Sequence, residues 1–278
     1  DVPEEVSGEF WREFHARVRS VNPEAYLVAE IWHHKPEWLQ GDMFDAFMNY
    51  PLTLGILGFA GQGRLATEAE LPYEYQGQFR VFDGPALWER ILELEELNDP
   101  AVTAVQLNLL GSHDTPRSRT LLGGDLDGVR LAVLVQMTLP GAPCIYYGDE
   151  IGMEGGMDPR CRAGFPEDPA ALETEPYGWT ADLVALRHSS RALRDGELSL
   201  LRADGPAIAY LRRDGAEAFA VVANAGDDPI DWEVDLPSEI AGAEVLPLRG
   251  GRQGAVDADG RRLRVRVPAR EGLVVRAG

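Results

Sequence analysis

The chain has 278 residues, of which 45% are hydrophobic, and its 46 acidic and 26 basic residues give a formal net charge of −20. This length and composition suit a soluble globular protein with a sizeable core. The acidic balance argues against nucleic acid and against an anionic membrane as partners, and no apolar run is long enough to span a membrane.

The first two thirds of the chain alternate helices with short apolar strands. Apolar side chains spaced four residues apart predict a first helix, with Ser7 as N-cap and Asn22-Pro23 as its end. The order predicts a parallel α/β sheet or barrel. The expected helices are residues 7–21, 52–60, 87–97, 127–139 and 180–193, and the expected strands are 25–31, 44–50, 103–110 and 142–147.

The pattern of apolar and polar residues changes after about residue 196. Short alternating segments are separated by turn residues such as Asp214-Gly215, which predicts a small antiparallel β domain. We therefore expect an α/β domain over residues 1–196 and an all-β domain over residues 197–278. The expected strands of the second are 207–212, 218–223, 230–234, 244–248, 263–267 and 272–275.

Acidic residues stand at the ends of the expected parallel strands. Glu30 closes the run AYLVAEI, Asp114 follows LNLLGSH, and Asp1 comes just before the first helix, where a preceding strand would end. The active site of a β/α barrel lies at the carboxyl ends of its strands. Burial of Glu30 between apolar neighbours would favour its protonated form, which suits a general acid. A solvated loop residue or helix cap is the alternative for each acid taken singly.

Three segments in the same order resemble the α-amylase family of glycoside hydrolases, and most of all its neopullulanase, cyclomaltodextrinase and maltogenic amylase subgroup. They are AEIWHHKPEWLQGDMFDAFMNYPL, LNLLGSHDTPR and IYYGDEIGMEGGMDPRCRAGFPED. The resemblance implies the second half of a TIM (β/α)8 barrel followed by a C-terminal antiparallel β-sandwich domain. It covers the chain to about residue 195 and is weaker beyond it.

The resemblance also implies residue roles. Asp1, in DVPEEV, would be the nucleophile, Glu30 the general acid/base and Asp114 the carboxylate that stabilises the transition state. His113 would hydrogen-bond the sugar. Trp32 would stack on a sugar beside the acid, and Asn49 and Tyr50 would line the rim of the pocket.

The implied activity is hydrolysis of α-1,4, and also α-1,6, glucosidic bonds with retention of configuration, in maltooligosaccharides, cyclodextrins or pullulan. A transglycosylase or isomerase of the same family and a non-catalytic carbohydrate-binding subunit are the alternatives. The chain starts on the nucleophile, so the resemblance implies a fragment that lacks the N-terminal half of the enzyme and is inactive alone. Relatives in the subgroup often pair through N-terminal modules, which leaves a homodimer open.

Three further expectations concern metals, cysteines and location. The oxygen-rich loop with Asp149, Glu150, Asp158 and Asp168 could hold calcium in the complete enzyme, but turn and cap roles are the stronger alternative, and we assign no metal site. Cys144 and Cys161 lack metal-ligand spacing, and a disulfide between them stays open. No signal-peptide pattern follows the first residue, so we expect a cytoplasmic protein. We also expect Arg117 to pair with a neighbouring acid.

Overall fold

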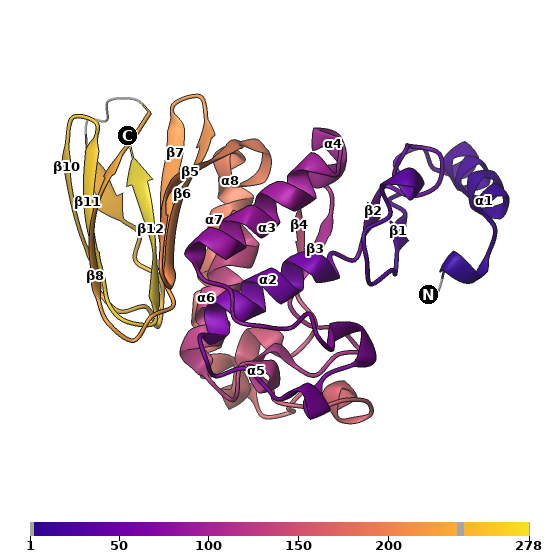
Figure 1. The fold of residues 1–278 in the computed structure, drawn as a ribbon, viewed down its shortest axis with the longest axis horizontal. Helices are drawn as coiled ribbons and strands as arrows, with labels where there is room; N and C mark the ends of the chain where they lie inside the picture. Colours follow the sequence, from indigo (N-terminus) through magenta and orange to yellow (C-terminus); the bar gives the residue numbers. More distant parts are fainter. Residues whose placement is uncertain (1–2, 238–241, 278) are drawn as a thin grey trace.

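The computed structural model describes residues 3–237 and 242–277. Helices and short parallel strands come first, and antiparallel sheets follow (Figure 1). The helices are α1 Gly8–Val21, α2 Tyr50–Gly61, α3 Gly84–Glu96, α4 Pro100–Thr103, α5 Ser118–Leu121, α6 Leu126–Thr138, α7 Glu175–Ser189 and α8 Arg191–Asp195. The strands are β1 Val28–Ala29, β2 Ala46–Phe47, β3 Leu107–Leu109, β4 Ala142–Cys144, β5 Glu197–Asp204, β6 Ala207–Asp214, β7 Glu217–Asn224, β8 Ile230–Asp235, β9 Ala243–Val245, β10 Ala255–Asp259, β11 Arg262–Val267 and β12 Glu271–Ala277.

The strands β1 to β4 form the parallel part of the fold. β1 pairs with β2 and β3 pairs with β4, both in parallel, and a parallel bridge between Met48 and Leu107 joins the two pairs. The carboxyl ends of these strands therefore meet at one edge, as the sequence predicts.

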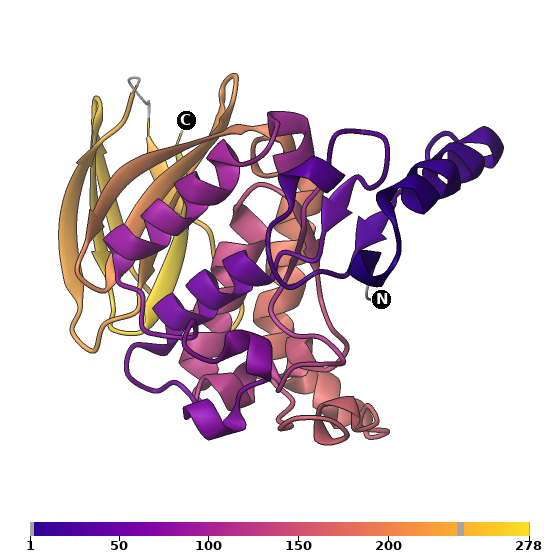
Figure 2. The ribbon, with the colours of Figure 1, turned by 45° about the vertical axis from the view of Figure 1, so that its right-hand side comes forward.

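Side-chain caps fix where most of the longer helices begin. Ser7, as predicted, accepts a hydrogen bond from the backbone N–H of Phe10, and Asn49 and Asp83 cap α2 and α3 in the same way. Each cap satisfies one of the N–H groups that the first turn leaves without a partner. α1 has no buried residue and projects from the rest of the molecule (Figures 1 and 2).

The parallel strands are shorter than predicted, and two boundaries are wrong. Tyr50 was expected in a strand but begins α2, because Asn49 caps that helix. Thr103 was also expected in a strand but ends α4, whose start is set by Asp99 and Pro100. In both cases a cap ends the extended segment earlier than its apolar pattern indicates.

The C-terminal region is a β-sandwich, as expected. A five-stranded sheet with the order β5-β6-β7-β12-β9 faces a three-stranded sheet with the order β10-β11-β8 (Figure 1). β5 and β10 were not predicted, because no residue in them is fully buried and their apolar pattern is weak. One hydrophobic cluster fills the sandwich.

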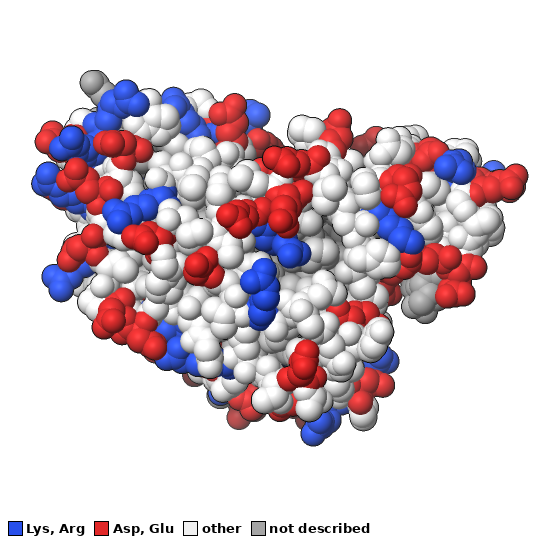
Figure 3. All heavy atoms as spheres, viewed as in Figure 1, with Lys and Arg blue, Asp and Glu red and all other residues white. Residues whose placement is uncertain are grey.

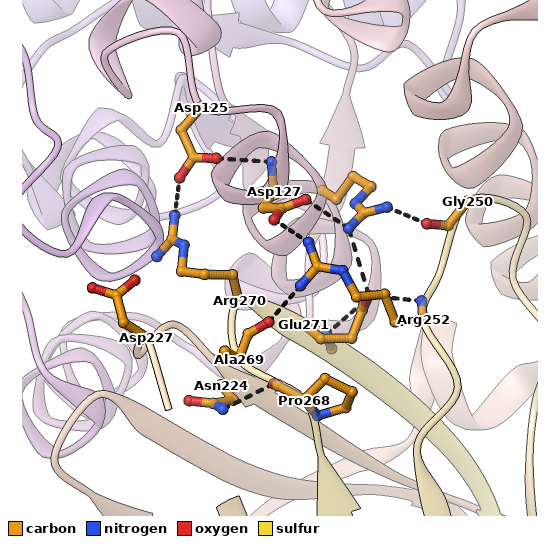
Figure 4. A network of polar contacts seen from close by, with 12 residues as sticks. Asp125, Asp127, Asn224, Asp227, Gly250, Arg252, Pro268, Ala269, Arg270 and Glu271 are labelled. Carbon is orange, nitrogen blue, oxygen red and sulfur yellow. Dashed lines mark hydrogen bonds and ion pairs between the residues drawn. The ribbon is translucent and has the colours of Figure 1, made fainter. Parts of the chain in front are cut away.

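The five-stranded sheet also packs on the helices. Tyr210, Phe219 and Val274 belong to the same hydrophobic cluster as α2 and α6, so the outer face of this sheet is buried against these helices. A polar network lies beside this contact (Figure 4). In it, Arg270 pairs with Asp125, Arg252 pairs with Asp127, and Arg130 of α6 lies near Glu271.

Two surface findings bear on partners. Acidic and basic side chains are interspersed over the face in Figure 3, consistent with the acidic net charge. Over the described residues, no helix has both the length and the hydropathy needed to cross a membrane.

Candidate active site

The parallel strands bring two of the predicted catalytic acids together. Glu30 comes directly after β1, and His113 and Asp114 lie in the loop that follows β3. One ligand-type atom from each of these three side chains lies within 4.8 Å of the others. We call Glu30, His113 and Asp114 the carboxylate–imidazole cluster.

His113 sits between the two carboxylates. Its Nε2 atom is 3.7 Å from Oε1 of Glu30 and 3.0 Å from Oδ2 of Asp114. The Glu30 side chain is 16% exposed, Asp114 is 35% exposed and His113 is 48% exposed, so a solute can reach the cluster from one side. Asp1, the predicted nucleophile, lies outside the described residues.

The aromatic side chains near the cluster form a stack. Trp32 lies on Tyr50 with ring centroids 4.0 Å apart, and the rings of Trp32 and Tyr75 form a T-shaped pair with centroids 5.7 Å apart. Trp32 remains partly exposed, so its free surface is available to a ligand.

The predicted place of Tyr50 at the pocket rim is wrong. Tyr50 is completely buried, and its hydroxyl donates to Oγ of Ser112, 3.1 Å away. Tyr50 therefore packs against Trp32 and holds the loop of His113 through its hydrogen bond to Ser112.

Both ends of the Asn49 side-chain amide form hydrogen bonds within the chain. Its amide nitrogen donates to Oδ1 of Asn108, and its own oxygen caps α2. The structure thus gives Asn49 a structural role, and because its side chain stays partly exposed, its place at the pocket rim remains a prediction.

Arg162 joins the site from a short 3-10 helix, Arg160–Arg162, that no sequence pattern connects with it. Its guanidinium donates from Nη2 to Oδ1 of Asp114 at 2.8 Å and from Nε to the carbonyl of His113 at 2.9 Å. Nε of Arg162 also lies 3.0 Å from Asp158, four residues earlier. Cys161 Sγ lies 3.2 Å from the same His113 carbonyl. The signal available in the sequence was the Asp-to-Arg spacing within DPRCR, which indicates only the pair with Asp158.

Arg117 pairs with an acid, as predicted. Its side chain is completely buried beneath Tyr146 and Tyr147, and its Nη1 lies 3.5 Å from Oδ1 of Asp149. That separation is too long for a strong hydrogen bond. Burial therefore dominates and raises the pKa of Asp149 to about 7, although Arg117 acts in the opposite direction.

The close packing of Asp149 explains a glycine in the β3 loop. A Cβ at Gly111 would lie 2.7 Å from Oδ2 of Asp149. The buried carboxyl thus lies directly behind the segment that presents His113 and Asp114.

Three of the acidic residues considered for a calcium site each interact with a different part of the chain. Asp149 pairs with Arg117, Asp158 with Arg162, and Asp168 caps a short helical turn. Within residues 3–237 and 242–277, the only group of three or more metal-ligating side chains is the carboxylate–imidazole cluster. Cys144 and Cys161 are both free thiols.

Comparison with known proteins agrees with this arrangement. Residues 1–195 match the alpha-amylase family, described as the alpha amylase catalytic domain. The chain belongs to the alpha-amylase family. The matched part of this α-amylase-family chain contains β1 to β4, the helices α1 to α8 and the carboxylate–imidazole cluster.

Relatives of this α-amylase-family chain include a cyclomaltodextrinase and a neopullulanase. It is 38% identical over 261 residues to a cyclomaltodextrinase of Geobacillus thermopakistaniensis, covering 93% of this chain and 41% of that protein. It is 39% identical over 210 residues to neopullulanase 2 of Thermoactinomyces vulgaris, covering 76% of this chain and 33% of that protein. The chain thus spans about two fifths of the first relative and one third of the second.

Solved structures of related enzymes resemble this chain over its C-terminal sandwich as well. The Nostoc punctiforme debranching enzyme superposes on 100% of this chain with a TM-score of 0.88 and 33% identity, over 57% of its own length. The same enzyme has been solved after soaking with acarbose. The fold therefore corresponds to part of an α-amylase-family structure, with parallel strands and helices followed by antiparallel sheets.

Proposed function

We propose that the protein to which this chain belongs is a retaining glycoside hydrolase. Its substrates would be α-1,4 glucans, with α-1,6 bonds as a further target, in maltooligosaccharides, cyclodextrins or pullulan. The observation that carries the proposal is the convergence of Glu30, His113 and Asp114 at the carboxyl ends of β1 and β3.

The proposed roles follow from the chemistry of the residues. Glu30 is the general acid/base, Asp114 stabilises the positive charge that develops on the sugar ring, and Asp1 is the nucleophile. Retention requires a nucleophile and an acid/base about 5–5.5 Å apart, with one ionised and the other protonated. His113, half-exposed beside both carboxyls, would donate to a sugar hydroxyl, and the free surface of Trp32 would stack on a sugar ring.

The length of the chain bears on activity. Because it spans 41% of the cyclomaltodextrinase it matches, we propose that the 278 residues alone have negligible hydrolase activity and need the N-terminal half of the enzyme. Four short parallel strands cannot close a barrel of eight, so water would not be excluded from the site. A relative described as an intracellular maltogenic amylase, from Bacillus subtilis, supports a cytoplasmic location.

The test uses the full protein encoded with the residues that precede Asp1. We expect it to hydrolyse pullulan and cyclodextrin, with the α-anomer as the first product by NMR. Glu30→Gln should lower kcat by about 10²- to 10⁴-fold, because the leaving oxygen loses its proton donor. Glu24→Gln, an exposed acid before β1, is the matched control and should leave kcat unchanged.

Three results would contradict the proposal. The first is a β-anomeric first product, and the second is an unchanged kcat in Glu30→Gln. The third is hydrolysis by the 278-residue chain alone at a rate typical of the family, and this result would refute only the need for the N-terminal half. Binding of maltooligosaccharide without turnover by the full protein would favour the carbohydrate-binding alternative. Transfer products that predominate over hydrolysis when acceptor sugar is added would favour the transglycosylase.

A further inference from the structure

The carboxylate–imidazole cluster has the spacing of a zinc site. In a tetrahedral zinc site with ligand atoms about 2.0–2.1 Å from the metal, neighbouring ligand atoms lie about 3.3 Å apart. The two measured separations from His113 Nε2, 3.0 Å to Asp114 and 3.7 Å to Glu30, lie on either side of that value. The ligand atoms of Glu30 and Asp114 lie within 4.8 Å of each other, so side-chain movements that draw these two carboxylates together would bring all three atoms within bonding distance of one ion.

The donor types narrow the choice of ion. One imidazole nitrogen with two carboxylate oxygens suits Zn²⁺, whereas Ca²⁺ and Mg²⁺ prefer oxygen ligands alone. The partial exposure of His113 and Asp114 leaves room for water as a fourth ligand. Three protein ligands and an open position are typical of accessible zinc sites.

Arg162 already orients two of the three ligands. Its hydrogen bond to Oδ1 of Asp114 leaves Oδ2 directed at His113, and its bond to the His113 carbonyl holds the backbone of that residue. Outer contacts of this kind fix the direction of metal ligands. The guanidinium also cancels one of the two carboxylate charges, so we expect weaker binding than at a structural zinc site.

We propose that Glu30, His113 and Asp114 bind Zn²⁺ through Oε1, Nε2 and Oδ2 respectively, and that the bound ion competes with sugar for these side chains. The metal site is a property of this chain and does not depend on its activity. The competition rests on the proposed function, because it assumes that sugar uses the same three groups.

The test begins with the purified, metal-free 278-residue chain titrated with Co²⁺, whose visible absorption reports its ligands. We expect one equivalent of Co²⁺ to bind and to be displaced by Zn²⁺. His113→Ala and Glu30→Gln should each weaken Zn²⁺ binding at least tenfold in calorimetry. Circular dichroism checks that both variants fold, and the isosteric Glu30→Gln preserves the test if His113→Ala does not.

His33→Ala is the matched control. His33 is a surface histidine whose Nε2 lies 3.4 Å from Glu4, so it offers an ordinary histidine–acid pair. Its loss should leave Zn²⁺ affinity unchanged. Equal affinity in His113→Ala and the unaltered chain, or loss of binding in His33→Ala, would overturn the proposed site.

A second measurement separates this inference from the proposed function. In the full protein, Zn²⁺ should raise the apparent KM for maltooligosaccharide without lowering kcat, and high substrate should relieve the inhibition. Inhibition that substrate does not relieve would refute the competition. A protein that binds Zn²⁺ through His113 but never cleaves glucan would count against the proposed function alone.

Discussion

At the scale of single residues, burial of the Asp149 carboxyl makes the stability of the fold depend on pH. Burial raises its pKa to about 7 in the folded chain, against 3.8 as the ordinary value. The folded state therefore holds a proton between these values that the unfolded state has released. Stability consequently falls as pH rises from about 4 to about 7.

Asp149→Asn should remove this dependence. Any loss caused by the substitution itself is the same at every pH, because an amide does not titrate. Relative to the unaltered chain, however, it should gain about 2–3 kcal/mol between pH 5 and pH 8, given 1.36 kcal/mol for each pKa unit. Urea unfolding at several pH values measures the difference.

The control for this experiment is Asp228→Asn, at an exposed acid in the turn after β7. Its stability should follow that of the unaltered chain at every pH. Parallel curves for Asp149→Asn and the unaltered chain would show that the buried carboxyl does not titrate in this range.

At the scale of elements, two glycines of α2 face different surroundings. A Cβ at Gly58 would lie 2.3 Å from the carbonyl of Arg80 and 2.7 Å from the ring of Phe82, whereas one at Gly55 would lie 3.2 Å from Cγ of Arg90. Alanine in a helix interior otherwise stabilises by about 0.5–1 kcal/mol relative to glycine. Gly58 is required because a neighbouring backbone approaches the helix closely.

Gly58→Ala should lower the free energy of unfolding by about 1–3 kcal/mol, as overpacking does. Gly55→Ala should cost much less, because the long Arg90 side chain can move aside. Denaturant midpoints of the two variants test the comparison. Equal losses at the two positions would mean that helix propensity, and not the approach of the Arg80 carbonyl, decides the effect.

Boundaries at this scale were the least predictable part of the sequence. The helix at 7–21 was located by its spacing and by Ser7, and the structure confirms both. The strands were overextended because an apolar run does not reveal which of its residues meet a neighbour in register. The capping oxygens of Asn49 and Asp99 decided those ends.

At the scale of the whole molecule, one face of the five-stranded sheet belongs to the same hydrophobic cluster as α2 and α6. Leu134 of α6 is completely buried within the cluster that includes the five-stranded sheet, and a Cβ at Gly272 of β12 would lie 2.1 Å from its Cδ2 atom. The predicted boundary at residue 196 separates two kinds of secondary structure. The shared cluster and the polar network of Figure 4 lead us to expect one cooperative unfolding unit.

Leu134→Ala and Leu263→Ala test this expectation from the two sides. Leu263 is completely buried inside the sandwich, so each variant should lose about 2–5 kcal/mol through cavity formation. Scanning calorimetry should show a single transition in the unaltered chain, shifted downward in both variants. Two transitions, each lowered by only one of the variants, would show that the regions unfold independently.

By itself, the sequence determined the family, most of the order of elements and the positions of Glu30, His113 and Asp114 at strand ends. Short-range patterns and motif residues carry that information. Only the tertiary structure decided that Tyr50 is buried, that Arg162 reaches Asp114 from a short 3-10 helix 48 residues away, and that Asp149 lies behind the β3 loop. These outcomes depend on which distant surfaces come into contact, and that is set by packing of the whole chain and not by local pattern.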